Sequence, residues 1–339
     1  MTSPPKSSIK IDTPSPPLSA SQEMMGNRET GPEFIRSEEL KNIVRIGTRG
    51  SPLALAQAHY VKHALQAQNT TISYQIVTLQ TSGDRFLEAD LKTIGGKGLF
   101  TKEIEQALIE KKIDLAVHSM KDVPTKRQNG LEILAVLPRE DPRDAFISHK
   151  YASFKELPHG AHIGTASLRR GAQLRRMRPD LRISLLRGNV QTRIKKVEDG
   201  YFDATLLAVA GLNRLGRQDV ITEIFDIETF PPAPAQGAIG IETSIQTSPE
   251  LKNLIKTINC NNTHLTVTAE RAFLAALDGN CQTPIAAYAD IEDDTIRLRG
   301  HILSENGLRI CSKKGSVPIK DAYILGTNLG QQAKDEFYA

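Results

Sequence analysis

Arginines gather in one short stretch of this 339-residue sequence. Residues 169–193 contain eight arginines and a single acidic residue. Arg169 and Arg170 follow Ser167 at an expected helix start, and Arg187 follows an expected strand. In open α/β sheets ligands bind at strand ends and helix starts, and the planar guanidinium group suits bidentate recognition of carboxylates or phosphates. The pattern therefore indicates a site for an anionic ligand.

A simpler interpretation applies to part of this stretch, because Arg175, Arg176 and Arg178 also fit an exposed basic helix. Ligand binding is favoured by a second junction of the same kind. There Arg49 ends an expected strand, and Ser51 is placed to cap the helix that follows. Two such junctions suggest an anionic ligand held in a cleft between two lobes.

An adjacent cation and carboxylate, Lys121 and Asp122, follow a β-rich run. Such a pair at a strand end could bind an anion and transfer protons. The same residue types are common in a polar turn before a proline, here Pro124. The motif by itself leaves both interpretations open.

Cys281 lies in a turn-like loop after an expected helix over 265–277. A lone cysteine is usually a small buried apolar residue, and its loop position allows a reactive thiol without establishing one. The three cysteines form no pair or cluster with zinc spacing. We therefore expect no metal site and a reducing, cytoplasmic setting.

The segment 82–98 is longer than a strand-to-helix connection requires and contains paired glycines. It does not match a Walker A motif, because no serine or threonine follows its Gly-Lys pair. We expect a mobile lid over the site, with a plain surface connection as the alternative.

Short β-rich runs alternate with helical stretches from Ile43 to Ala208, which predicts an α/β fold with mainly parallel sheets. The proline-rich residues 230–235 predict a crossover between two lobes, and from Ile285 onward we expect short strands. The expected parts are a disordered extension over 1–42, a first α/β lobe over 43–137 and 237–256, a second over 138–236, and a smaller C-terminal α+β domain over 257–339.

Composition excludes several classes of protein. Because 39% of the residues are hydrophobic and 24% are charged, neither a wholly disordered chain nor a fibrous repeat fits. No apolar run approaches about 18 residues, so we expect no membrane span, and residues 1–40 lack a secretory signal. The net charge of +4 does not require nucleic acid, and the basic stretch lacks interleaved aromatic residues.

Seven segments, in family order, resemble the hydroxymethylbilane synthase family, also called porphobilinogen deaminases. They are residues 47–54, 95–103, 116–124, 167–170, 186–193, 210–216 and 270–281. The resemblance extends from about residue 43 to the end of the chain. It implies two lobes similar to periplasmic binding proteins and a third domain whose cysteine anchors a dipyrromethane cofactor through a thioether. Cys281 matches that cysteine, although Asn280 stands where the family usually has glycine.

The resemblance also implies roles for individual residues. Asp122 matches the catalytic acid and base, which contacts the pyrrole nitrogens and the cofactor. The other matches to cofactor binding are Cys281, Arg49, Ser51, Lys97, Ser119, Lys121, Ser167, Arg169, Arg170, Arg187 and Gly188. The matches to substrate binding are Arg49, Gln57, Phe100, Arg193 and Arg214.

The implied enzyme is a transferase that condenses four porphobilinogen molecules on the covalent primer, with loss of ammonia, and releases the linear tetrapyrrole hydroxymethylbilane for haem biosynthesis. Its implied partners are porphobilinogen and the growing polypyrrole chain, without nucleic acid or membrane, and it is expected to be a cytoplasmic monomer. The alternative is a passive anion-binding or sensor protein with the same lobes, which would need neither Cys281 nor Asp122.

Overall fold

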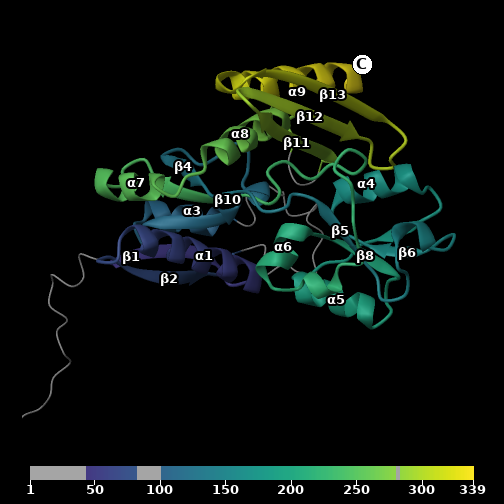
Figure 1. The fold of residues 1–339 in the computed structure, drawn as a ribbon, viewed down its shortest axis with the longest axis horizontal. Helices are drawn as coiled ribbons and strands as arrows, with labels where there is room; N and C mark the ends of the chain where they lie inside the picture. Colours follow the sequence, from purple (N-terminus) through teal and green to yellow (C-terminus); the bar gives the residue numbers. More distant parts are fainter. Residues whose placement is uncertain (1–42, 82–100, 280–282) are drawn as a thin grey trace, which may run out of the picture. The chain divides into compact units, whose positions relative to one another are not determined.

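The computed structural model describes residues 43–81, 101–279 and 283–339. Within these ranges the chain forms two five-stranded sheets and one three-stranded sheet, with helices packed on them (Figure 1). Short 3-10 helices are η2 (Met120–Asp122), η3 (Phe154–Glu156), η4 (Gln218–Val220) and η5 (Ile319–Asp321).

The first sheet has the strand order β2-β1-β3-β10-β4. Its strands are β1 (Ile43–Arg49), β2 (Ser73–Leu79), β3 (Leu115–Ser119), β4 (Leu131–Val136) and β10 (Ile239–Ser244). β1 is parallel to β2 and β3, whereas β10 is antiparallel to β3 and β4. The accompanying helices are α1 (Pro52–Gln68), α3 (Lys102–Ile109) and α7 (Pro249–Lys256).

The second sheet repeats this pattern of pairing in the order β7-β6-β8-β5-β9. Its strands are β5 (Asp144–Ile147), β6 (His162–Gly164), β7 (Arg182–Ser184), β8 (Ala204–Ala208) and β9 (Glu223–Ile224). β6 is parallel to β7 and β8, and β5 is antiparallel to β8 and β9. Its helices are α4 (Leu168–Met177), α5 (Val190–Glu198) and α6 (Val209–Arg214).

The predicted α/β fold with parallel-rich sheets is confirmed: in each of the two larger sheets four strands run in one direction, and a single strand, β10 in the first and β5 in the second, runs against them. The reversed strand β10 is added when the chain, having left the first sheet after β4, returns to it. Residues 230–235 lie in the returning connection between β9 and β10. Each of the two larger sheets has its own core of buried apolar side chains. The core of the first includes Ile46 and Leu115, and that of the second includes the stacked rings of Phe225 and Phe230.

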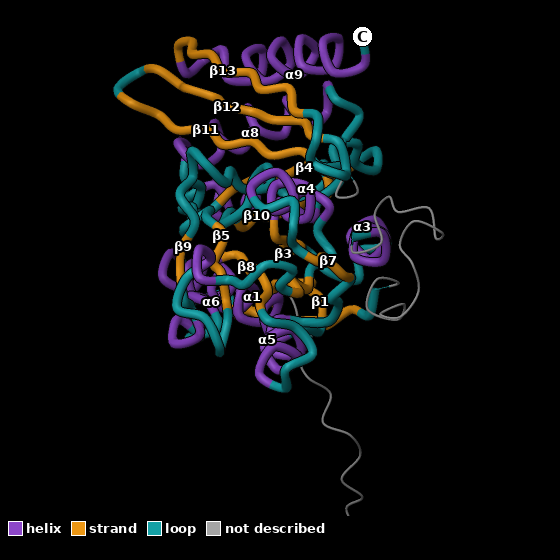
Figure 2. Tube along the Cα trace, turned by 90° about the vertical axis from the view of Figure 1, so that its right-hand side faces the viewer, coloured by secondary structure: helices purple, strands orange, loops and turns teal. Residues whose placement is uncertain are grey.

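The C-terminal part is an antiparallel meander packed against two helices (Figure 2). The strands are β11 (Ile285–Glu292), β12 (Thr295–Leu303) and β13 (Ile310–Pro318), and the helices are α8 (Asn261–Ala276) and α9 (Ala322–Tyr338). The short strands expected after Ile285 are present, but the expectation did not include α9. Gly326 and Gly330 lower the helix propensity of this segment, but a Cβ on Gly326 would lie 2.1 Å from the Ala269 carbonyl oxygen. The glycines therefore allow α9 to pack closely on α8.

Among the described residues, no helix combines the length and the apolar character needed to cross a membrane.

Candidate active site

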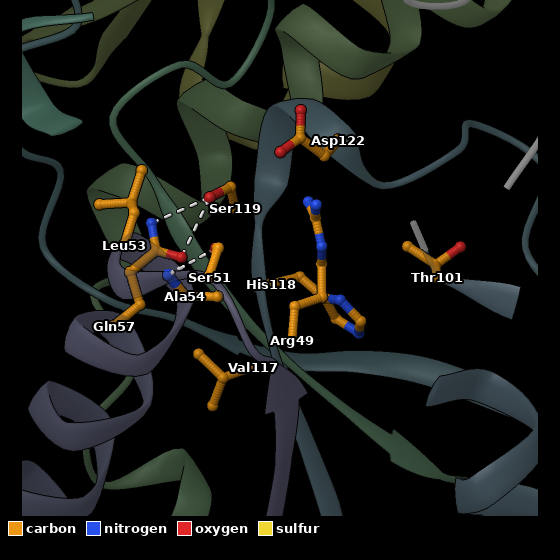
Figure 3. Close-up of a pocket in the computed structure, with 10 residues that line it drawn as sticks. All are labelled: Arg49, Ser51, Leu53, Ala54, Gln57, Thr101, Val117, His118, Ser119 and Asp122. Atoms are coloured by element: carbon orange, nitrogen blue, oxygen red, sulfur yellow. Dashed lines mark hydrogen bonds between the residues drawn. The ribbon is translucent and has the colours of Figure 1, made fainter. Parts of the chain in front are cut away.

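A pocket lies where β1 and β3 end (Figure 3). Because β1 and β3 are parallel neighbours, the residues that follow them meet at one edge of the first sheet. The pocket contains five of the predicted site residues, together with side chains for which no role was predicted. Its lining residues are Arg49, Ser51, Leu53, Ala54, Gln57, Thr101, Val117, His118, Ser119 and Asp122.

The start of α1 positions one side of the pocket. Ser51 is the N-cap of this helix, as predicted, and its side chain accepts a hydrogen bond from the Ala54 backbone N–H at 3.3 Å. Gln57 is buried and exchanges two hydrogen bonds with Ser119. Its Nε2 donates to the Ser119 Oγ at 2.9 Å, and that Oγ donates to the Gln57 Oε1 at 3.0 Å. These bonds fasten α1 to the end of β3.

Asp122 and Lys121 follow β3 on the short helix η2. Figure 3 shows the guanidinium end of Arg49 directed toward the Asp122 carboxylate. The Lys121 Nζ donates to the Gln236 Oε1 at 3.4 Å. Loss of hydration lowers the pKa of Lys121 to about 8, and the nearby Arg170 acts in the same direction, whereas Asp122 opposes the shift. Lys121 can therefore change its charge near physiological pH.

Arg169 and Arg170 lie in the first turn of α4, where Ser167 is the N-cap and accepts a hydrogen bond from the Arg170 backbone N–H at 3.4 Å. Both arginines are buried, and both contact Asp144, which is also buried. The Nη2 atom of Arg169 lies 2.7 Å from the Asp144 Oδ2, and that of Arg170 lies 2.6 Å from the Oδ1. Burial acts to raise the pKa of Asp144, but the two guanidinium groups hold it well below its ordinary value.

Arg187, Gly188 and Arg193 lie around the start of α5. Gly188 has a φ of +116°, a left-handed conformation that favours glycine. Its carbonyl oxygen accepts a hydrogen bond from the Arg193 Nε at 2.8 Å. Loss of hydration and the charge of Arg170 lower the pKa of Arg193 to about 10, while Asp122 raises it. The electrostatic coupling places Arg193 in the same neighbourhood as Asp122.

Arg214 ends α6, and its Nη2 donates to the Gly237 carbonyl oxygen at 2.6 Å. Burial lowers the pKa of Arg214. This contact joins the second sheet's last helix to the segment that returns to the first sheet.

The remaining predicted features lie outside the described residues. They are Cys281 with its neighbour Asn280, Lys97, Phe100, the segment 82–98 and the extension 1–42.

Two buried polar residues of this region, Asp144 and Gln236, were not predicted as site residues. Their partners are far away in the sequence, so no local pattern marks them. His118 lies in the segment 116–124 of the family resemblance, but no role was predicted for it. It is buried, lines the pocket, and its Nε2 lies 3.1 Å from the Oε2 of buried Glu242. No group of three His, Cys, Asp or Glu side chains suited to a metal ion occurs within the described ranges.

The donors present fit a ligand that carries several carboxylates. The charge of Arg170 lowers the pKa of three neighbouring cations, namely Lys121, Arg169 and Arg193. These four side chains therefore form one cationic region. In addition, the buried Nε of Arg169 makes no hydrogen bond within the described structure. Such an N–H is suited to an oxygen atom of a bound ligand. The fold and site thus define an α/β protein with a cationic region, near Asp122, that is suited to a carboxylate-bearing ligand.

Comparison with known proteins identifies the family. Residues 44–251 match the family model for the porphobilinogen deaminase dipyromethane cofactor binding domain, and residues 264–335 match that for the porphobilinogen deaminase C-terminal domain. The porphobilinogen deaminase of Paracoccus denitrificans (strain Pd 1222) is 50% identical over 296 residues, which are 87% of this chain and 94% of that protein. The chain belongs to the porphobilinogen deaminase family. The family predicted from the seven segments is confirmed, and so is the prediction of a dipyrromethane cofactor.

Solved structures with some likeness include a nutrient binding protein from Burkholderia cenocepacia bound to methionine. It is 12% identical with a TM-score of 0.41, covering 63% of this chain and 90% of that one. The periplasmic VFT2 domain of Bordetella pertussis BvgS is 14% identical with a TM-score of 0.40, covering 69% and 96%.

Proposed function

We propose that the pocket containing Asp122 is where this chain performs the reaction of its family. Family membership makes the chain a hydroxymethylbilane synthase, a transferase of porphyrin and haem biosynthesis that uses porphobilinogen and a growing pyrrole chain. One observation supports this location. Asp122 lies in a pocket at the strand ends, and its charge acts to raise the pKa of both Lys121 and Arg193.

Asp122 is the proposed catalytic residue. Loss of ammonia from porphobilinogen places positive charge on the pyrrole ring, and a nearby carboxylate lowers the energy of that charge. After the new carbon–carbon bond forms, the same carboxylate can accept the proton whose loss restores the aromatic ring. One residue can therefore serve both stages.

Cys281 is the proposed attachment point of the dipyrromethane through a thioether. When bound, this group supplies the pyrrole carbon to which the first substrate unit is joined. The carboxylates of the cofactor would be held by cationic and hydroxyl side chains near Asp122. The proposed set is Arg49, Ser51, Lys97, Ser119, Lys121, Ser167, Arg169, Arg170, Arg187 and the backbone of Gly188.

The substrate and the later rings add two carboxylates each, and these need further donors. Arg49, Arg193 and Arg214 are the proposed cationic contacts, with Gln57 and Phe100 as neutral ones. Arg193 and Arg214 are partly buried, and loss of hydration lowers the pKa of each, which supports this assignment because a less hydrated guanidinium group binds a carboxylate more strongly.

We propose further that the enzyme acts as a monomer in the cytoplasm. Three cysteines without paired spacing support the reducing compartment. Light scattering of the purified protein, with and without porphobilinogen, would test the oligomeric state, and a dimer at micromolar concentration would contradict it.

The decisive experiment concerns the cofactor and its attachment. Purified protein should react with Ehrlich's aldehyde reagent, and intact-protein mass spectrometry with peptide mapping should find a dipyrromethane adduct on Cys281. Incubation with porphobilinogen should add further pyrrole units to the same peptide and release hydroxymethylbilane. The matched control is Cys260→Ser, which should keep the adduct, whereas Cys281→Ser should lose it. An active enzyme with the mass of the bare polypeptide, or an adduct on Cys260 or Cys311, would overturn the assignment.

A further inference from the structure

Gln236 lies in the segment that returns to the first sheet, and only 1% of its surface is exposed. Both ends of its side-chain amide are used. The Oε1 accepts a hydrogen bond from the Lys121 Nζ at 3.4 Å. The Nε2 donates to the Asp144 Oδ1 at 2.9 Å and to the Pro142 carbonyl oxygen at 2.7 Å.

The two charged partners of Gln236 come from different sheets. Lys121 follows β3 of the first sheet and is adjacent to Asp122, whereas Asp144 begins β5 of the second sheet. Asp144 in turn binds the guanidinium groups of Arg169 and Arg170. One neutral amide thus lies between the cation beside the proposed catalytic residue and the paired arginines proposed to bind carboxylates.

The charges on its two sides determine the orientation of this amide. An ammonium group can only donate and an ionised carboxylate can only accept, so the oxygen must face Lys121 and the NH₂ must face Asp144. The opposite orientation would place the amide NH₂ against the Lys121 ammonium group and the amide oxygen against the Asp144 carboxylate. Because the site is buried, the unmet hydrogen bonds would have no water to replace them.

We propose that Gln236 is a positioning residue for the reaction: it holds the Lys121 ammonium group and the Asp144-bound arginines at a fixed separation, so that both can bind carboxylates of the same pyrrole chain. The inference rests on the proposed function of this site. A glutamine is suited to the task because it is neutral. A carboxylate in its place would repel Asp144, and an apolar side chain would leave Lys121 and Asp144 each without one hydrogen bond.

The test compares Gln236→Met with Gln173→Met in cofactor-loaded enzyme. Gln173 is a matched control, because it is 6% exposed and its Nε2 donates to the Pro231 carbonyl oxygen at 3.3 Å. Both variants lose a buried amide, and Gln236→Met should lower the Tm more, because it loses hydrogen bonds to Lys121, Asp144 and Pro142 whereas Gln173→Met loses one. Only Gln236→Met should raise KM for porphobilinogen, by about tenfold, which is the usual effect of losing a hydrogen bond to a charged group.

A second variant, Gln236→Glu, keeps the shape and the acceptor for Lys121. The charged groups that influence Lys121 are Asp122, Arg170, Asp144 and Arg169. A new carboxylate at 236 favours the charged form of Lys121, so it should shift the alkaline limb of the activity profile to higher pH if the Lys121 ammonium group serves the reaction; a glutamine contact without a part in the reaction predicts no such shift. If Gln236→Met does not fold, the pH profile of Gln236→Glu alone tests the inference.

The inference is overturned if Gln236→Met and Gln173→Met have the same KM, or if Gln236→Glu leaves the pH profile unchanged. Failure of the proposed function is a separate result, because then the unmodified enzyme itself would not consume porphobilinogen.

Discussion

Arg139 and Glu270 form a bidentate ion pair that is almost fully shielded from water. The Arg139 Nη1 lies 2.6 Å from the Glu270 Oε1, and the Nη2 lies 3.0 Å from the Oε2. The same carboxylate accepts hydrogen bonds from the backbone N–H groups of Ala235, at 2.5 Å, and Ala289, at 2.8 Å. Arg139 follows β4, and Glu270 belongs to α8. The pair therefore joins the returning segment and β11 to the helix that precedes Cys281.

Glu270→Gln should strongly destabilise the protein. It leaves the Arg139 guanidinium, whose side chain is 11% exposed, without its counter-charge. Breaking one partner of a buried pair usually costs about 3 to 5 kcal/mol. Urea denaturation would measure the loss. The control is Asp199→Asn at the exposed pair with Lys195, where solvent screens the charges and we expect a much smaller change. Equal losses would contradict the structural role of Glu270.

Asp122→Asn should abolish most of the activity without unfolding the protein. The substitution keeps the size of the side chain but removes the charge and the proton-accepting oxygen, and loss of a general acid or base typically costs about 10² to 10⁴ in rate. Single-turnover addition of porphobilinogen to cofactor-loaded enzyme would measure the rate. Near-normal turnover in a loaded, folded variant would exclude the proposed role.

Arg170→Lys should impair cofactor loading or chain elongation far more than Arg176→Lys. Arg170 is buried, and its guanidinium group donates hydrogen bonds to Asp144 and to the Leu206 carbonyl oxygen. Arg176 is exposed. Lysine keeps the charge but cannot reproduce the planar fork. Intact mass spectrometry of loaded and elongated species gives the comparison. Similar effects at both positions would favour the alternative interpretation, in which the arginines form an exposed basic helix surface.

Activity should fall as the pH rises through about 8, because the pKa of Lys121 is lowered to about 8 from an ordinary value of 10.5 and its neutral amine cannot pair with a carboxylate. Stability should show the opposite trend. Between about pH 8 and 10.5 the unfolded chain binds a proton at this lysine that the folded chain does not, so this lysine makes the free energy of unfolding increase with pH.

Lys121→Met is the reference for both measurements. The difference in unfolding free energy between the unmodified protein and Lys121→Met isolates this lysine from other groups that titrate at high pH. An alkaline limb that persists unchanged in the residual activity of Lys121→Met would show that another group is responsible.

Gly307→Ala should be more destabilising than Gly160→Ala. Both glycines have left-handed backbones, with φ of +76° and +75°, so alanine carries a similar backbone cost at each. A Cβ on Gly307 would lie 2.5 Å from the Ala172 carbonyl oxygen of α4, whereas nothing lies within 4 Å at Gly160. Thermal unfolding of the two variants would measure the contact between the β12–β13 turn and α4. Identical Tm values would mean that this contact contributes nothing.

Local sequence patterns were sufficient to predict the elements around the site. Ser51 before Pro52 predicted the start of α1, and the alternation of β-rich and helical stretches predicted the α/β class. The residue roles inferred from the family resemblance remain predictions, including those of Cys281 and Asp122.

Sequence alone determined which charged and capping residues follow each strand, because capping and strand propensity depend on neighbours along the chain. Only the tertiary structure decided what those residues contact. Arg170 binds Asp144, 26 positions away, and Gln236 reaches Lys121, 115 positions away. Likewise α9 forms despite two central glycines, because it packs on α8. Hydrogen bonds and burial depend on distances in space, which are set when the chain passes from the first sheet to the second after β4 and returns to the first at β10.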